Sequence, residues 1–98
     1  MIIIITEPSS QKTLNNKWYV YIVECRDKSL YTGITNNLEK RIETHNSGKG
    51  AKYTRARRPI KLKYYEEIEN KSLALKREFA IKQLTRAQKN QLINNLQK

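Results

Sequence analysis

The side chains best suited to chemistry are two tyrosines, an arginine and a histidine. Tyr21, Tyr31, Arg41 and His45 follow one another at short intervals. A tyrosine can pack in a core and still offer its hydroxyl to a reaction or to a phosphate. Together the four predict a polar cluster where a sheet meets a helix, although a single tyrosine is more often a core residue. His45 is the one histidine, which excludes a multi-histidine metal site and a two-histidine acid–base pair.

Glu78 is the acid whose surroundings make it a candidate. Apolar residues lie one helical turn before and after it, among them Ala74 and Ile81. An unpaired carboxylate near a packed face is costly. Two interpretations stay open: an exposed pair with Lys82, worth about 0.3–0.5 kcal/mol, or a carboxylate directed at a cation, either a metal ion or Arg41.

A basic loop is the third feature. Residues 44–63 contain seven Lys and Arg and no acid, so seven of the eleven net positive charges lie there. A solvated charge run is the common outcome, but the lack of compensating acids favours contact with phosphate. Gly48 and Gly50 let the backbone approach a phosphate, and Tyr53 could stack on a base. The candidate nucleic-acid-binding residues are Lys49, Lys52, Tyr53, Arg55, Arg57 and Arg58.

Composition restricts the class of protein. The 98 residues suffice for one domain, and their net charge of +11 favours a polyanionic partner. We expect nucleic acid and not a membrane, because no helix pairs a strongly apolar face with a basic one. The single cysteine, Cys25, excludes a disulfide and a cysteine-cluster metal site. With neither a bilayer-spanning segment nor a secretion signal, we expect a cytoplasmic protein.

The charge also divides the chain. Residues 1–16 hold one acid and one base, so the whole excess belongs to residues 17–98. We expect an N-terminal extension over 1–16, either an edge strand or a flexible end, and one domain over 17–98.

The predicted strands position the two tyrosines. Residues 18–25 are aromatic and β-branched and apolar on both alternating faces, which predicts an inner strand covered on both sides. A turn at 26–28 and a second strand over 29–34 complete a hairpin. A three-residue turn sets the register, placing Tyr31 opposite Val23 and Gly33 opposite Tyr21. The two tyrosines then share one face.

Three helices and a third strand complete the expected fold. Asn36 and Glu39 form a capping box that starts the first helix, which buries Leu38 and Ile42 and ends at Gly48. A loop over 49–59 leads to a strand over 60–68, with Leu62, Tyr64 and Ile68 on one face. Ser72 begins a second helix that ends near Leu84, and Thr85 with Gln88 begins a third, whose inward residues are Leu92, Ile93 and Leu96. The order ββαβαα predicts an α/β domain of the α+β type, with a small three-stranded, mainly antiparallel sheet flanked by three helices.

The ordered set of motifs resembles the GIY-YIG nuclease superfamily. The segments are Tyr19-Val20-Tyr21 and Tyr31-Thr32-Gly33, followed by Arg41, His45 and the distant Glu78. The stretches 18–22 and 45–55 are similar to the small, stand-alone bacterial members, and the resemblance covers about residues 17–93. Tyr19 stands where the superfamily name has Gly, a substitution that is usual among the small members.

The resemblance implies divalent-metal-dependent cleavage of phosphodiester bonds. By this analogy Glu78 holds a single Mg²⁺ or Mn²⁺, which polarises the scissile phosphate and stabilises the leaving oxygen. Arg41 pairs with the pentacovalent phosphate. Tyr31, helped by Tyr21 and His45, orients or deprotonates the attacking water. As a base, a tyrosine needs positive charge nearby, because its ordinary pKa is near 10.

The leading hypothesis is therefore a metal-dependent endonuclease acting on DNA. With no separate DNA-targeting domain attached, its activity is expected to be weak, structure-directed or dependent on a protein partner. The alternative is a non-catalytic basic module that binds DNA or RNA without a metal. A third reading is a small basic protein that docks on ribosomal RNA or on a protein.

Overall fold

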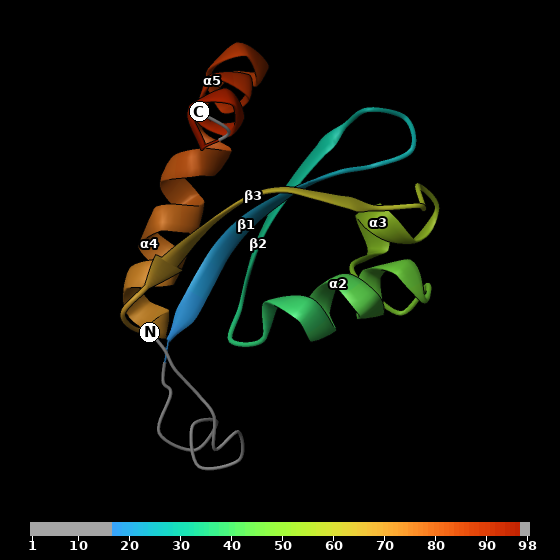
Figure 1. Cartoon of the computed structure of the whole chain (residues 1–98), viewed down its shortest axis with the longest axis horizontal. Coiled ribbons are helices and arrows are strands. Elements are labelled where there is room, and N and C mark those ends of the chain that lie inside the picture. Colours follow the sequence, from blue (N-terminus) through green and yellow to red (C-terminus); the bar gives the residue numbers. More distant parts are fainter. Residues whose placement is uncertain (1–16, 97–98) are drawn as a thin grey trace, which may run out of the picture.

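A three-stranded antiparallel sheet forms the centre of the fold, with helices on both of its faces (Figure 1). The computed structural model describes residues 17–96, so the predicted N-terminal extension lies outside the described residues. The predicted α+β class and the three-stranded sheet are confirmed. The elements are β1 (Trp18–Glu24), β2 (Leu30–Thr35), α2 (Leu38–Asn46), α3 (Lys52–Arg55), β3 (Lys61–Ile68), α4 (Lys71–Lys82) and α5 (Arg86–Leu96).

Strand β1 lies between β2 and β3 and is buried on both sides. Its Val20 and Ile22 pack into one core with residues of β3, α4 and α5. Its Tyr21 and Val23 pack into a second core on the opposite face, against which α2 is packed. The prediction of an inner strand covered on both sides is confirmed, and the face that carries Tyr21 is the one that meets α2.

The turn between β1 and β2 sets the register of the hairpin. The N–H of Cys25 donates to the carbonyl of Ser29 at 2.9 Å, and Lys28 takes the left-handed φ of 72°. Tyr21 pairs with Gly33, and Val23 pairs with Tyr31, as predicted. Because side chains alternate along a strand, Tyr21 and Tyr31 share one face of the sheet.

Gly33 leaves room for the ring of Tyr21 across the strand pair. A Cβ atom on Gly33 would lie 2.6 Å from the Tyr21 hydroxyl oxygen and 2.8 Å from Cζ. These distances are shorter than any real contact of that kind, so the phenol could not stay in place. The glycine of the Tyr31-Thr32-Gly33 segment therefore positions a tyrosine of the neighbouring strand.

Two predicted helix starts were wrong by one or two residues. Helix α2 is capped by Asn37, whose side chain accepts from the N–H of Lys40 at 3.2 Å, and not by Asn36. The hydroxyl of Thr35 binds both the N–H and the carbonyl of Asn37, which holds that residue extended in the cap conformation.

Helix α4 starts earlier than predicted because Asn70 precedes Ser72. The Asn70 side chain accepts from the N–H of Leu73 at 2.9 Å and caps the helix. The capping box of Thr85 and Gln88 is confirmed by reciprocal hydrogen bonds of 2.9 and 3.2 Å. Of the predicted inward residues of α5, Ile93 is buried and Leu92 partly so, while the side chain of Leu96 lies outside the described residues.

The basic loop and the third strand also differ in detail from the prediction. The loop contains one helical turn, α3, which was not expected. In β3, Tyr64 pairs with Ile22 whereas Leu62 pairs with Val23, because the register shifts between those two residues of β1. Ile22 and Val23 point to opposite faces, so Leu62 does not share the face of Tyr64 and is 36% exposed.

An ion pair fixes α4 to β3. The guanidinium of Arg77 donates two hydrogen bonds of 2.8 Å to the two carboxylate oxygens of Glu66. These hydrogen bonds lower the pKa of Glu66, and the hydroxyl of Tyr64 also donates to this carboxylate. Such two-pronged pairing fixes direction as well as distance. It therefore sets the rotation of α4, on which Glu78 is the next residue.

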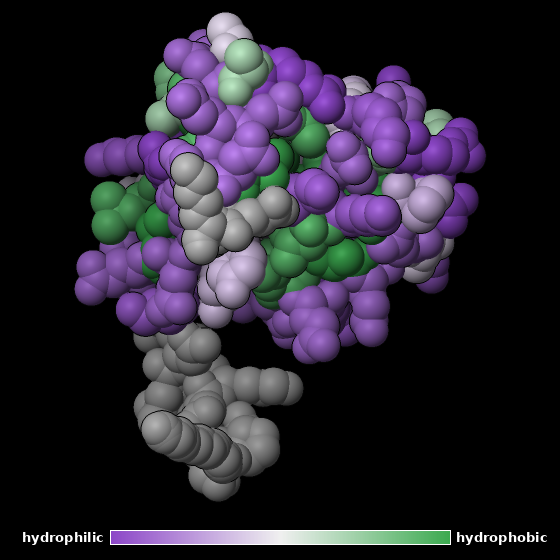
Figure 2. Space-filling view, turned by 45° about the horizontal axis from the view of Figure 1, so that its top comes forward, coloured by the Kyte–Doolittle hydropathy of each residue, from purple (hydrophilic) through white to green (hydrophobic). Residues whose placement is uncertain are grey.

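Hydrophilic residues dominate the face of the molecule shown in Figure 2. The exposed apolar side chains include Leu73, Leu75 and Phe79 of α4. Among the described helices, none combines the length and the apolar character needed to cross a membrane.

The contact between Gly33 and Tyr21 predicts the effect of a single added methyl group. Gly33→Ala should lower the free energy of unfolding by about 1–3 kcal/mol, since the phenol must leave its position. Denaturant unfolding measures this loss. In a Tyr21→Leu background, which lacks the colliding atoms, the same change should cost much less. Equal costs in the two backgrounds would contradict the contact.

Candidate active site

The hydroxyl of Tyr21 is the centre of a hydrogen-bonded cluster on the α2 side of the sheet. It lies 2.8 Å from Nε2 of His45, and Nε of Arg41 donates to it at 3.4 Å. Arg41 and His45 are four residues apart and therefore project from one face of α2. The structure thus brings three of the predicted site residues into direct contact.

His45 is completely buried, and both of its ring nitrogens have partners. Nδ1 lies 2.8 Å from Oγ1 of Thr54, whose single proton is donated to the carbonyl of Ala51 at 3.0 Å. Thr54 must then accept from Nδ1–H, which leaves Nε2 without a proton and makes it the acceptor for the Tyr21 hydroxyl. The donors run in one direction, from Arg41 through Tyr21 and His45 to Thr54.

Burial keeps these two groups neutral. Desolvation, with the charge of Arg41 as the second cause, lowers the pKa of His45 from 6.5 to about 4. Desolvation also raises the pKa of Tyr21, although the hydrogen bond and charge of Arg41 oppose this. At neutral pH His45 is therefore an uncharged acceptor and Tyr21 keeps its proton, so both hold the cluster together and neither is poised to take a proton from water.

Of the two site tyrosines, Tyr31 is the one whose hydroxyl has no hydrogen bond within residues 17–96. Its ring meets His45 edge-on, with 5.6 Å between the ring centroids, and stacks on Tyr53 at 6.0 Å with an interplanar angle of 21°. The side chain is half-buried, and its hydroxyl binds no group within residues 17–96. Unlike that of Tyr21, this hydroxyl is available to an incoming water or substrate.

Arg57 and Tyr53, both predicted to bind nucleic acid, pack against each other. The guanidinium carbon of Arg57 lies 4.0 Å from the centroid of the Tyr53 ring, and its Nε donates to the Asp27 carboxylate at 3.1 Å. Hydrogen bonds from Ser29, followed by that from Arg57, lower the pKa of Asp27. Arg57 and Tyr53 therefore pack next to Tyr31. The four other predicted binding residues are all exposed: Lys49, Lys52, Arg55 and Arg58.

Glu78 belongs to α4, which packs on the other face of the sheet. Its carboxylate pairs with Lys82 at 3.3 Å, so the pair with Lys82 that the sequence left open is present. Its side chain is only 18% exposed, and its charge helps to raise the pKa of Tyr21. Glu78 therefore lies within electrostatic range of the Tyr21 cluster.

Glu78 can hold a divalent metal only if water and the substrate supply the other ligands. Within residues 17–96 no three His, Cys, Asp or Glu side chains gather in a way that could hold an ion. Mg²⁺ needs few protein ligands, because one or two carboxylates suffice when water and substrate phosphate supply the other oxygens. A lone, partly exposed carboxylate fits an ion that binds together with the substrate.

The cluster lies within a segment that matches a known family. Residues 17–92 match the model described as the GIY-YIG catalytic domain. The chain belongs to the GIY-YIG family. In this GIY-YIG chain the two motifs of the family name lie side by side on β1 and β2. Membership supports nuclease activity and a nucleic-acid substrate in general terms.

Relatives of this GIY-YIG chain cover most of its length. A UPF0213 protein of Clostridium perfringens is 65% identical over 77 residues, which are 79% of this chain and 83% of that one. A UPF0213 protein of Staphylococcus haemolyticus is 58% identical over 77 residues, covering 79% and 94%. The solution structure of a UPF0213 protein from Bacillus halodurans has a TM-score of 0.52 at 46% identity, covering 80% and 83%. That of a protein from E. faecalis has a TM-score of 0.58 at 41% identity, covering 85% and 88%.

Two residues around His45 were not found by sequence reasoning. One is Thr54, which is fully buried and holds Nδ1. The other is Gly50, where a Cβ atom would lie 2.4 Å from Nδ1 and 2.8 Å from Cα of His45. The sequence suggested that Gly50 lets the backbone approach a phosphate. In the structure the backbone at Gly50 packs closely against the imidazole of His45. A buried histidine needs a partner for each nitrogen, and that need was the available signal for Thr54.

His45 should titrate far below the ordinary range. As the single histidine of the chain, it gives one imidazole signal, and NMR should follow it to a pKa near 4. Its folded pKa is depressed, so the unfolded chain binds the proton first as the pH falls below 6.5. Stability is then lost between pH 6.5 and 4, by at most roughly 3 kcal/mol. A midpoint at pH 6 or above would refute the buried, hydrogen-bonded state.

Thr54 should fix which nitrogen of His45 carries the proton. Thr54→Val removes the acceptor of Nδ1–H while keeping the shape of the side chain, so the imidazole should move its proton to Nε2 or lose about 1–3 kcal/mol of stability. Nitrogen chemical shifts of the ring report the tautomer. Thr54→Ser, which restores the hydroxyl, should retain the original pattern. An unchanged tautomer and unchanged stability in the valine variant would contradict the assignment.

Proposed function

We propose that this GIY-YIG chain is a divalent-metal-dependent endonuclease that hydrolyses phosphodiester bonds of DNA. The observation that carries the proposal is the hydrogen-bonded series Arg41–Tyr21–His45 beside the unpartnered hydroxyl of Tyr31. It places a fixed guanidinium and an available phenol on the same side of one sheet. A core tyrosine pair alone would not need the arginine.

Arg41 is the group that would bind the phosphate. Its Nε is engaged by Tyr21, which leaves the terminal N–H groups for two phosphate oxygens. Held in this way, the guanidinium needs little reorganisation as negative charge develops on the pentacovalent phosphorus. Tyr21 and His45 act through Arg41 and are positioning residues, since both are buried.

Tyr31 is the group that would orient the attacking water. Its hydroxyl has no partner within the described residues and can accept from water or release its proton. The phenolate form is negatively charged, so Arg41 and a bound cation would stabilise it. The stacking of Tyr53 and the edge contact of His45 restrict the ring, which favours one direction of attack.

Glu78 is the carboxylate that would hold Mg²⁺ or Mn²⁺, an ion that when bound supplies polarisation of the scissile phosphate and stabilisation of the leaving oxygen. For this role Glu78 exchanges its contact with Lys82 for the cation. The Lys82 side of this pair is open to solvent, so the pair is worth only about 1 kcal/mol and the exchange is feasible.

DNA is the substrate that we assign. The exposed cations Lys49, Lys52, Arg55 and Arg58 follow directly after the helix that carries Arg41 and His45. They can neutralise backbone phosphates without reading bases. Cleavage guided by the shape of the nucleic acid, or by a protein partner, is the form that fits such contacts.

Nicking of DNA with Mg²⁺ or Mn²⁺ should depend on Arg41 and Glu78. Arg41→Ala and Glu78→Ala should each lower the cleavage rate at least about 100-fold, because each removes charge stabilisation in the transition state. Gel assays on duplex, single-stranded, flap and branched substrates measure this, with and without metal. Lys40→Ala and Glu43→Ala, exposed neighbours on α2, are matched controls and should cleave normally. Full activity in both site variants would refute the assignment.

The pair between Glu78 and Lys82 favours one alternative, a non-catalytic nucleic-acid-binding module. In that case the carboxylate is already neutralised and no metal is needed. Tight, salt-sensitive binding without cleavage of any substrate in the panel, at any metal concentration, would support the alternative and exclude the nuclease.

A further inference from the structure

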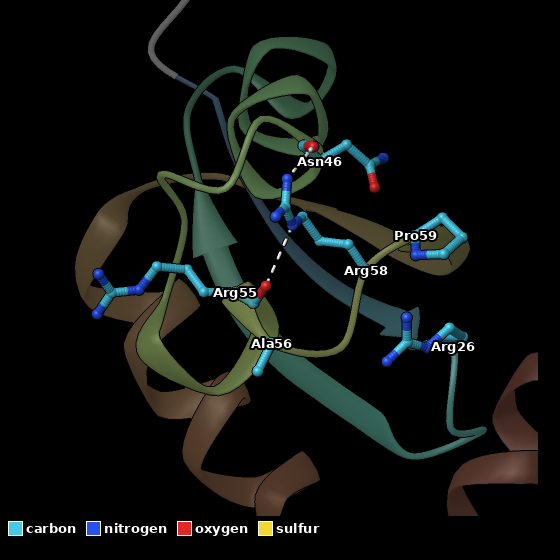
Figure 3. A pocket seen from close by; sticks show the side chains of 6 residues that line it. All are labelled: Arg26, Asn46, Arg55, Ala56, Arg58 and Pro59. Atoms are coloured by element: carbon cyan, nitrogen blue, oxygen red, sulfur yellow. Dashed lines mark hydrogen bonds between the residues drawn. The ribbon is translucent and has the colours of Figure 1, made fainter.

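A pocket separate from the Tyr21 cluster lies between the β1–β2 turn and the chain that follows α3. Its volume is about 630 Å³, and none of its lining residues belongs to the Tyr21 cluster (Figure 3). Arg26, which the sequence places in a turn, lines this pocket together with two arginines of the basic loop. The lining residues are Arg26, Asn46, Arg55, Ala56, Arg58 and Pro59.

Arg58 is held in place by the backbone around it. Its Nε donates to the carbonyl of Arg55 at 3.1 Å, and its Nη1 donates to the carbonyl of Asn46 at 3.3 Å. The guanidinium also lies over Gly48, where a Cβ atom would be 3.0 Å from Nη1. Three of its five N–H groups remain for a ligand. This arginine is therefore ordered before anything binds.

Arg26 supplies the second cation. In Figure 3 the side chain of Arg58 turns toward Asn46 and the backbone of Arg55, that of Arg26 extends toward Ala56, and that of Arg55 points away from both. The backbone N–H of Arg26 donates to the carbonyl of Arg57 at 2.8 Å, which ties the turn to the loop. The two guanidiniums are thus joined by fixed backbone.

The charge of the pocket is not compensated. No acid lines it, and neither Arg26 nor Arg58 forms an ion pair with any part of residues 17–96. The contrast is Arg57, the arginine next to Arg58 in the sequence, which pairs with Asp27. Placing like charges around one hollow costs energy unless an anion enters it.

We propose that the pocket binds a backbone phosphate of the nucleic acid other than the one that is cleaved, held between Arg26 and Arg58. The choice of nucleic acid as the ligand rests on the proposed function, because two guanidiniums by themselves bind a phosphate of any origin. Exposed Lys49 and Lys52 nearby in the chain extend the basic surface beyond one ion, which favours a polyanion over free phosphate.

The pocket and the Tyr21 cluster share the same short helices. Asn46 in the pocket follows His45 of the cluster, and Arg55 follows Thr54. The Asn46 side-chain amide accepts from the backbone N–H of Ile60 at 2.7 Å and donates to its carbonyl at 3.0 Å, which ties the end of α2 to the residue just before β3. A nucleic-acid strand whose phosphate is bound in the pocket would therefore keep a constant orientation relative to Arg41.

The test compares substitutions at two exposed arginines, each of which removes one positive charge. Binding of a short DNA duplex is measured in EDTA, where no cleavage occurs, over a range of salt concentrations. Arg26→Gln should weaken binding about tenfold and reduce the magnitude of the salt slope by about 0.9, the value for one lost phosphate contact. Arg86→Gln, at the start of α5, is the matched control and should change the affinity less than twofold. Equal effects of the two variants would overturn the proposal.

A second arm separates a backbone phosphate from a free ion. Inorganic phosphate is titrated while NMR follows the Nε–H of Arg58. A saturable shift that DNA abolishes in the wild type and that Arg26→Gln removes supports the proposal. A phosphate shift that persists in the presence of DNA would mean a free-anion site and overturn it. Neither arm uses metal or cleavage. Both therefore still test the phosphate site if the earlier assay shows no nuclease activity.

Discussion

The buried hydrogen bond between Tyr21 and His45 joins the two halves of the site. Tyr21 belongs to the central strand and His45 to the helix that covers it, and neither polar group has access to water. A buried polar atom without a partner costs about 1–3 kcal/mol, so α2 can dock on the sheet only in the arrangement that satisfies both nitrogens of the imidazole. Thr54 and Gly50 complete that arrangement from the loop. The position of Arg41 follows from it, because Arg41 lies one turn before His45.

The arginines that line the site and its surroundings differ in whether a carboxylate neutralises them. Arg77 and Arg57 are paired with carboxylates, and they fix α4 and the basic loop respectively. Arg26 and Arg58 have no carboxylate partner in the described chain and face a hollow. In a protein with a net charge of +11, most cations must stay in solvent. What distinguishes the second group is that the backbone holds the Arg58 side chain and ties the turn with Arg26 to the loop, so the two charges stay close at the cost of self-repulsion, which a polyanion would relieve.

Family membership and geometry bear on different questions. The match over residues 17–92 gives the fold and the class of chemistry. The geometry separates the two tyrosines, since Tyr21 is committed to two hydrogen bonds while the hydroxyl of Tyr31 has no partner within residues 17–96. It also shows that His45 is completely buried, so its imidazole cannot contact a water outside.

The sequence by itself determined the elements and the register. Side-chain alternation and the length of the hairpin turn fix Tyr21 opposite Gly33 and put both tyrosines on one face, since both rules are local. Local rules were less certain where two capping residues compete, as at Asn36 and Asn37. Only the tertiary structure decided that Thr54 holds His45, that α4 with Glu78 packs on the other face of the sheet, and that Arg26 and Arg58 line one pocket. Those pairs depend on how helices and loops pack on the sheet, and packing is set by the whole core together, so no spacing along the chain encodes it.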